Sequence, residues 1–131
     1  TQPLAFTKTV QANAEENATA AGIAISGTST YITGSFDNKI GFTSGALAKQ
    51  SLGMKDILIA RLDDKGQWDS SRLAGGSDND VATAITVDRF GGVYITGFFQ
   101  GEIKNFQDSS SPVTLKAKAT QSLFVWKIPS P

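Results

Sequence analysis

Acidic residues near the middle of the chain have the side-chain chemistry of a calcium site. Asp78, Asn79 and Asp80 are adjacent, and Asp88 follows them closely. Carboxylate and amide oxygens are the hard ligands that Ca²⁺ prefers, although this spacing differs from that of an EF-hand loop. Asp and Asn also cap turns by bonding to their own backbone. A calcium site at Asp78, Asp80 and Asp88 is therefore one hypothesis, and turn chemistry is the other.

Two tryptophans have flat apolar rings on which a sugar can stack. Trp68 and Trp126 both occur within strand-like segments. A buried aromatic ring contributes a large apolar area to a core. Ligand stacking by Trp68 and Trp126 is one interpretation, and packing between sheets is the other.

Enzymatic chemistry has few candidate residues in this chain. There is no histidine and no cysteine, so the commonest general base and the thiolate nucleophile are absent. Glu15-Glu16 and Asp63-Asp64 are carboxylate pairs of the type used in glycoside hydrolysis. Adjacent side chains on a strand point to opposite faces, however. We therefore expect a non-enzymatic protein without a cofactor.

Charge and composition narrow the class of partner. Twelve basic and twelve acidic residues cancel, which gives no general attraction for nucleic acid or anionic membranes. No apolar run approaches the roughly 18–20 residues needed to span a bilayer. Ser and Thr number 13 each, which suits solvated strands and secreted adhesive proteins. We expect an extracellular or cell-surface location, with a signal already removed or the chain excised from a longer one.

An internal repeat organises the chain. The sequence YITG occurs at 31–34 and again at 94–97. Aligning the two copies also brings 21–36 over 83–99, and 56–62 over 122–128. The sequence therefore predicts a single domain of two repeats, approximately residues 4–66 and 67–131.

Each repeat has the pattern of β-structure. β-branched and aromatic residues alternate with small or polar ones, and Asp and Gly mark the turns. The segment 12–24 is rich in Ala and Glu and favours a helix on propensity, but its counterpart 74–85 contains Gly75-Gly76, so we predict extended chain in both. The expected strands are 20–25, 30–36, 56–62, 67–73, 83–87, 93–99 and 122–128.

Two long connections, 37–55 and 100–121, occupy equivalent positions in the repeats. Long loops on a rigid scaffold are frequent binding sites. We expect a short extra strand around 40–42 and around 103–106. The candidate ligand-binding residues in these loops are Asp37, Asn38, Lys39, Gln100, Glu102 and Lys104.

Both repeats resemble a known family, and the resemblance is strongest over residues 55–106. Arg61-Leu62, Trp68, Gly75-Gly76-Ser77, Val87-Asp88 and the second YITG follow one another in the order of the bacterial seven-bladed β-propeller repeat family. The first repeat departs from that pattern because Asn13-Ala14 replaces Gly-Gly. The resemblance implies an all-β fold of two four-stranded antiparallel blades.

The resemblance also implies how the last blade is completed. The second repeat has three predicted strands, and residues 5–10 would supply the fourth, within one ring or to a neighbouring chain. Propellers have about four to eight blades, so we expect either a homo-oligomer or a fragment of a larger propeller. The expected function is a binding or scaffold module for protein contact or self-assembly, and the alternative is a lectin-like subunit that binds glycans.

Overall fold

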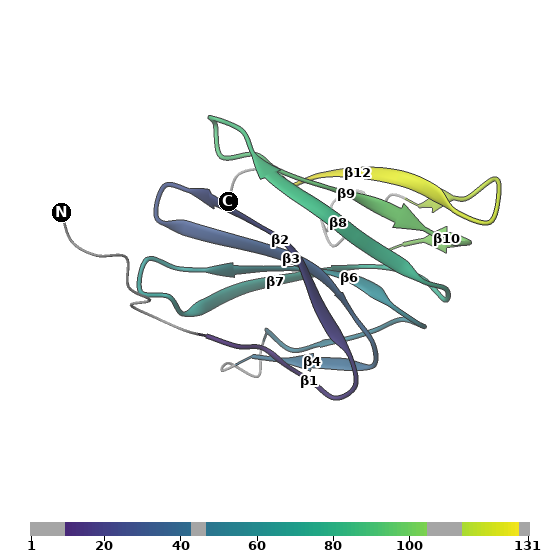
Figure 1. Cartoon of the computed structure of the whole chain (residues 1–131), viewed down its shortest axis with the longest axis horizontal. Coiled ribbons are helices and arrows are strands. Elements are labelled where there is room, and N and C mark those ends of the chain that lie inside the picture. The colour runs from purple at the N-terminus through teal and green to yellow at the C-terminus, as the bar shows by residue number, and fades with distance from the viewer. Residues whose placement is uncertain (1–9, 43–46, 105–113, 129–131) are drawn as a thin grey trace.

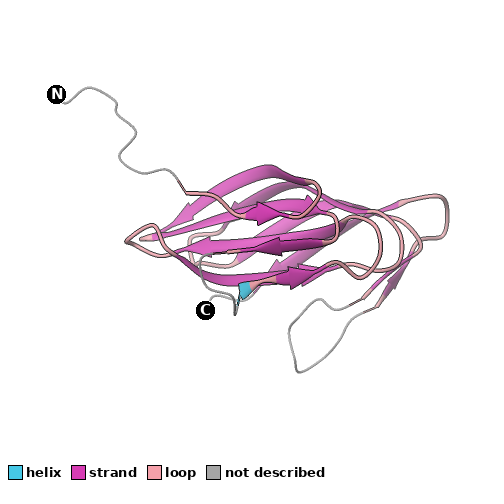
Figure 2. Cartoon of the chain, turned by 90° about the horizontal axis from the view of Figure 1, so that it is seen from below, coloured by secondary structure: helices cyan, strands magenta, loops and turns pink. Residues whose placement is uncertain are grey.

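The computed structural model describes residues 10–42, 47–104 and 114–128. These segments form antiparallel sheets (Figure 2). The described residues contain no α-helix, and the short cyan segment is a 3₁₀ turn at Leu47. No helix in this part of the chain is long and apolar enough to cross a membrane. The prediction of an all-β fold is confirmed.

The sheets stack in layers (Figure 1). Sheet I has the strand order β2-β3-β6-β7, with bounds Ala18–Ser26, Ser29–Phe36, Asp56–Leu62 and Trp68–Ala74. Sheet II has the order β8-β9-β12, with bounds Asp80–Val87, Val93–Phe99 and Ser122–Ile128.

Small strands complete the fold. Sheet III joins β1 (Asn13–Ala14), β4 (Lys39–Gly41) and β5 (Lys49–Gln50). A further pair joins β10 (Glu102–Ile103) to β11 (Leu115–Lys116). The extra strands expected in the long connections are thus present at β4 and β10, while Phe106 lies outside the described residues.

The strand predictions are confirmed, and so is the choice of strand over helix near the N-terminus. Residues 18–26 form β2, which pairs along its length with β3. Tertiary pairing thus overrides the helical propensity of the Ala-rich segment. The predicted strand at 5–10 lies outside the described residues except for Val10, which is not in a strand.

Two turns between strands, at residues 63–67 and 88–92, have the predicted chemistry. Asp63 accepts hydrogen bonds at Oδ1 from the backbone of Lys65 and Gln67. Asp88 does the same for Phe90 and Gly92. Each turn has a later glycine at positive φ, which an L side chain rarely adopts.

Sheet I has two faces with different neighbours. The face of sheet I toward sheet II is called its forward face, and the opposite face is its rear face. The face of sheet II toward sheet I is called its rear face, and the opposite face is its forward face. The rear face of sheet II packs on the forward face of sheet I, and this interface holds the main core. It contains Tyr31, Ile57 and Ile59 from sheet I and Ile95, Phe124 and Trp126 from sheet II, among others.

A second, smaller core lies on the rear face of sheet I. Phe36, Leu58 and Leu73 pack there with Ile40 of β4. Sheet III covers this end of the face. The other end, toward the close of β2, has no such cover: Ile23 and Ile25 are 65 % and 71 % exposed.

Candidate functional site

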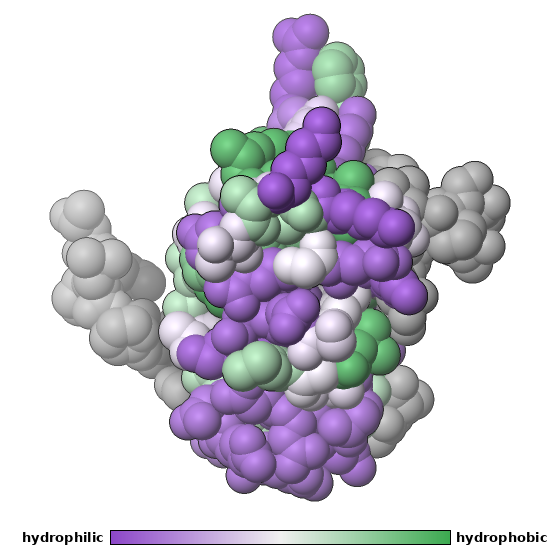
Figure 3. Space-filling view, turned by 90° about the vertical axis from the view of Figure 1, so that its right-hand side faces the viewer, coloured by the Kyte–Doolittle hydropathy of each residue, from purple (hydrophilic) through white to green (hydrophobic). Residues whose placement is uncertain are grey.

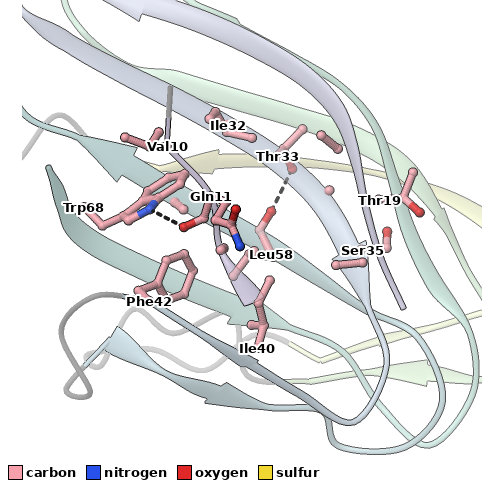
Figure 4. A pocket seen from close by; sticks show the side chains of 15 residues that line it. Val10, Gln11, Thr19, Ile32, Thr33, Ser35, Ile40, Phe42, Leu58 and Trp68 are labelled. Carbon is pink, nitrogen blue, oxygen red and sulfur yellow. Dashed lines mark hydrogen bonds between the residues drawn. The ribbon is translucent and has the colours of Figure 1, made fainter. Parts of the chain in front are cut away.

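An apolar pocket of about 270 Å³ lies on the rear face of sheet I, and Trp68 forms part of its wall (Figure 4). The indole N–H of Trp68 donates to the backbone oxygen of Gln11 at 3.1 Å. Phe42 meets the indole edge-on, with ring centroids 5.2 Å apart. Other apolar lining residues are Val10, Ala18, Ile32, Ile40, Leu58 and Ala60.

The pocket has a simple origin in the repeat. The alignment places Ala60 of β6 at the position of Trp126 of β12. On the rear face of sheet II, the large indole of Trp126 fills the space between the two sheets. On the rear face of sheet I, a methyl group stands in its place, and the space stays open. The pocket therefore lies at the sheet I position that corresponds to Trp126 in sheet II.

The two tryptophans have different environments. Trp68 is half-buried and lines the pocket. A ligand in the pocket would therefore contact its ring, which is one of the two roles predicted for it. Trp126 is 8 % exposed and belongs to the core between the sheets. The position of Trp126 corrects the stacking prediction for that residue, because a buried ring presents no face to a sugar.

Polar residues gather at one end of the molecule, where β8 begins and β10 lies (Figure 3). A shallow hollow of about 540 Å³ there is lined by Asp37 from one long connection and Gln100 from the other. The other lining residues are the polar residues Lys55, Asn79 and Gln121 and the apolar residues Met54, Val81 and Phe98. The structure thus brings two of the predicted loop residues together across the repeats.

The other predicted loop residues are spread out. Asn38 lies beside Asp37 in a left-handed turn with φ of 58°. Lys39 is exposed on β4. Glu102 and Lys104 form an ion pair at 3.4 Å. These four residues do not line the hollow that Asp37 and Gln100 share.

The predicted calcium ligands do not form one site. Asp80 opens β8 and Asp88 follows its last residue, which separates them by roughly 26 Å at about 3.3 Å per residue. Asp88 instead caps its turn and accepts from Tyr94 Oη at 3.0 Å. The N–H groups of Gly92 and Phe90 lower its pKa. No group of three metal-ligating side chains occurs in the described segments, so the set Asp78, Asp80 and Asp88 is wrong as a metal centre.

A calcium titration checks this correction. We expect millimolar Ca²⁺ or excess chelator to shift the melting temperature by less than about 1 °C, because a ligand stabilises a protein only when it binds the folded chain more tightly than the unfolded one. Differential scanning fluorimetry with Mg²⁺ as the matched control measures it. A saturable, calcium-specific rise of several degrees would contradict the expectation.

Two carboxyl groups lie close together at the junction between the sheets, although no pattern in the sequence pairs them. Asp56 and Asp80 are both fully buried. Gly76 N–H donates to Asp80 Oδ2 at 2.8 Å, and Leu52 N–H donates to Asp56 Oδ2. Oδ1 of each accepts no hydrogen bond from the described residues. The side chains of Asp56 and Asp80 hydrogen-bond to each other, which requires a proton on one of them, because two carboxylates offer only acceptors.

Burial raises the pKa of both acids. Loss of hydration brings the pKa of Asp56 to about 6 and that of Asp80 to about 7. The negative charge of Asp56 raises the Asp80 pKa further. Groups shifted this way are often functional, but here both lie inside the protein, where a substrate does not reach them.

The Gly75-Gly76 pair belongs to the same junction. A Cβ on Gly75 would lie 2.2 Å from the Asp56 carboxyl group, and one on Gly76 would lie 1.9 Å from the backbone oxygen of Glu102. The glycines therefore let the chain cross closely over Asp56 as it passes from β7 to β8. Asp56 itself was not among the predicted site residues, and its place beside this glycine pair is visible only in three dimensions.

The comparisons with known proteins agree with this architecture. Residues 70–97 match the model of the family described as beta-propeller repeat, SBBP. The matched segment runs from β7 of sheet I, across the Gly75-Gly76 junction, into β9 of sheet II. No curated protein matches the chain. The resemblance seen in the sequence is thus confirmed over residues 70–97, where the chain is similar to a beta-propeller repeat.

Proposed function

We propose that this protein is a non-enzymatic binding and scaffold module, secreted or on a cell surface, that makes protein–protein contacts through its open sheet faces. One observation carries the proposal. Leu123 and Val125 on the forward face of sheet II are 78 % and 64 % exposed, and Ile23 and Ile25 on the rear face of sheet I are similarly open. Apolar side chains clustered on a sheet face are typical of a surface that another protein covers.

The acids support a role without catalysis. A general acid or base must come within hydrogen-bonding reach of its substrate. The two acids with raised pKa, Asp56 and Asp80, are fully buried. The sequence adds no histidine or cysteine. These features favour a structural role for the buried pair.

Glycan binding at the Trp68 pocket is the second candidate. The pocket offers an aromatic wall beside Thr19, Thr33 and Ser35. The indole N–H of Trp68 is already used by Gln11, however, and Thr33 Oγ1 donates to the backbone oxygen of Leu58 at 3.0 Å. Few polar groups are left to read sugar hydroxyls, so protein contact is the better supported of the two.

The proposal predicts that the exposed apolar residues do not contribute to the stability of the fold. Leu123→Lys and Ile25→Lys should each change the free energy of unfolding by less than about 0.5 kcal/mol, as expected for surface substitutions. Denaturant unfolding over a series of protein concentrations, extrapolated to dilution, measures this for the single chain. A loss above about 2 kcal/mol would show that these side chains belong to the core and would remove the main support for contact.

Tryptophan fluorescence separates the two candidates. We expect no saturable change when sugars of varied stereochemistry are added. A saturable change that disappears in Trp68→Phe would favour the glycan-binding alternative instead.

A further inference from the structure

The interface between sheets I and II contains a set of residues that the repeat duplicates. On the forward face of sheet I, Tyr31, Ile57 and Ile59 are 7 %, 0 % and 3 % exposed because sheet II covers them. On the rear face of sheet II, Ile85 and Val87 of β8 pack against the same core. Each of these positions has a counterpart in the other repeat.

The counterparts of the four aliphatic residues in this set are exposed. Ile57 and Ile59 align with Leu123 and Val125, which lie on the forward face of sheet II. Ile85 and Val87 align with Ile23 and Ile25, which lie on the rear face of sheet I. The two open faces are therefore the two halves of an interface that the chain forms once internally.

A short piece of chain already lies where a preceding repeat would meet sheet I. Ala12 aligns with Ala74 and packs on the rear core of sheet I, just as Ala74 packs in the core between sheets I and II. Asn13 pairs with Gly41 of β4. The counterpart Gly75 forms the same type of bridge with Lys104, next to β10. The rear face is thus organised to receive another sheet of this kind.

We propose that the forward face of sheet II in one copy docks on the rear face of sheet I in a second copy, repeating the internal interface head to tail. This inference rests on the proposed function and names its partner, a second copy of the chain. Leu123 and Val125 of one copy would take the places of Ile57 and Ile59. Ile23 and Ile25 of the other would take the places of Ile85 and Val87.

The substitutions between the repeats are compatible with this contact. Ala18 and Ser122 align with Asp80 and Asp56, so joining two copies buries no carboxyl pair. Phe98 replaces Ser35, whose Oγ accepts from Ala82 N–H at 3.2 Å in the internal interface. The contact between copies therefore exchanges one hydrogen bond for apolar area.

One substitution makes the contact between copies looser. Ala84 aligns with Gly22, where a Cβ would lie 3.0 Å from Ile85 Cγ2. The facing isoleucine, Ile23 in the second copy, must shift by a few tenths of an ångström to accommodate the extra methyl group. We expect the contact to be weaker than the internal one and to depend on protein concentration.

Single-face variants test the head-to-tail geometry. Leu123→Lys blocks the forward face and Ile25→Lys blocks the rear face, and Ala84→Lys is a second forward-face variant. Phe90→Lys is the matched control, because Phe90 is 75 % exposed in the turn between β8 and β9, away from both faces. Size-exclusion chromatography with light scattering over a concentration series gives the mass, and circular dichroism verifies folding.

We expect the wild type and Phe90→Lys to exceed the mass of one chain, 13.8 kDa, and each single-face variant to remain at that mass. An equimolar mixture of Leu123→Lys and Ile25→Lys should form dimers, because each variant supplies the face that the other lacks. Single-face variants that still associate alone, or a mixture that stays monomeric, would overturn the inference. A monomeric wild type would overturn it too, while the proposed contact function would still be judged by the unfolding measurements above.

Discussion

Gly97→Ala should unfold the protein or lower its free energy of unfolding by about 3 kcal/mol or more, because relief requires movement of the backbone rather than of a side chain. A Cβ on Gly97 would lie 2.0 Å from the backbone oxygen of Val81. Gly34 is its counterpart, and a Cβ there would lie 2.0 Å from the backbone oxygen of Thr19. We expect the same loss from Gly34→Ala.

The reason is a shared irregularity in the two sheets. Gly97 pairs with Ala82, and the pairing of β8 with β9 shifts by one residue directly after that pair. Gly34 pairs with Ala20, followed by the same shift. The bulge brings a carbonyl group over the glycine, which leaves no room for a side chain. This explains why the repeated YITG ends in glycine.

Gly41→Ala is the control for this prediction. A Cβ on Gly41 would lie 3.8 Å from the nearest atom, an ordinary contact. Its free energy of unfolding should stay within about 0.5 kcal/mol of the wild type. Chemical denaturation of the three variants gives the comparison. Equal stability of Gly97→Ala and Gly41→Ala would contradict the role given to the bulge.

Stability should fall as pH rises from about 5 to 8. The folded protein holds the pKa of Asp56 at about 6 and that of Asp80 at about 7, above the ordinary value of 3.8. A carboxyl group with a raised folded-state pKa binds its proton more tightly in the folded chain than in the unfolded one. Its contribution to the free energy of unfolding is therefore complete below pH 3.8. This contribution is lost as the pH rises through about 6 for Asp56 and about 7 for Asp80. From pH 5 upward, about one pKa unit of the Asp56 shift and about two units of the Asp80 shift remain. At about 1.4 kcal/mol per pKa unit, the pair therefore changes stability by on the order of 4 kcal/mol.

The composition of the chain makes the pH dependence easier to assign to the two acids. Histidine, the usual source of pH dependence in this window, is absent. Asp80→Asn should flatten the profile and raise stability at pH 8, because the amide retains an oxygen for Gly76 N–H and adds a donor for Asp56. Asp64→Asn, in the exposed turn after β6, should leave the profile unchanged. Denaturant unfolding at several pH values is the assay, and stability that increases from pH 5 to 8 would rule out the proton between the two acids.

Local patterns were sufficient to predict the long strands. The β-branched and aromatic runs at 56–62, 93–99 and 122–128 have the predicted bounds in the structure. The repeat identified the equivalent positions, and these in turn show which faces are open. Strands of two residues, such as β5 and β11, have no periodicity to detect.

The candidate site was less predictable because its residues meet through tertiary structure. Asp56 lies next to Asp80 only because the chain crosses between sheets at Gly75-Gly76. The pocket beside Trp68 depends on a small side chain, Ala60, on a neighbouring strand. The acids Asp78, Asp80 and Asp88 are close in sequence, but the extended strand between Asp80 and Asp88 carries them apart.

The matched repeat begins in one sheet and ends in the next, since β7 belongs to sheet I and β8 and β9 belong to sheet II. Each boundary between repeats therefore lies within a sheet, and the boundary between sheets lies within a repeat. In-frame duplication or deletion of a whole repeat would then preserve both the strand pairing and the junction at its ends. Recombination between repeats could change the number of sheets without the need to evolve a new joint.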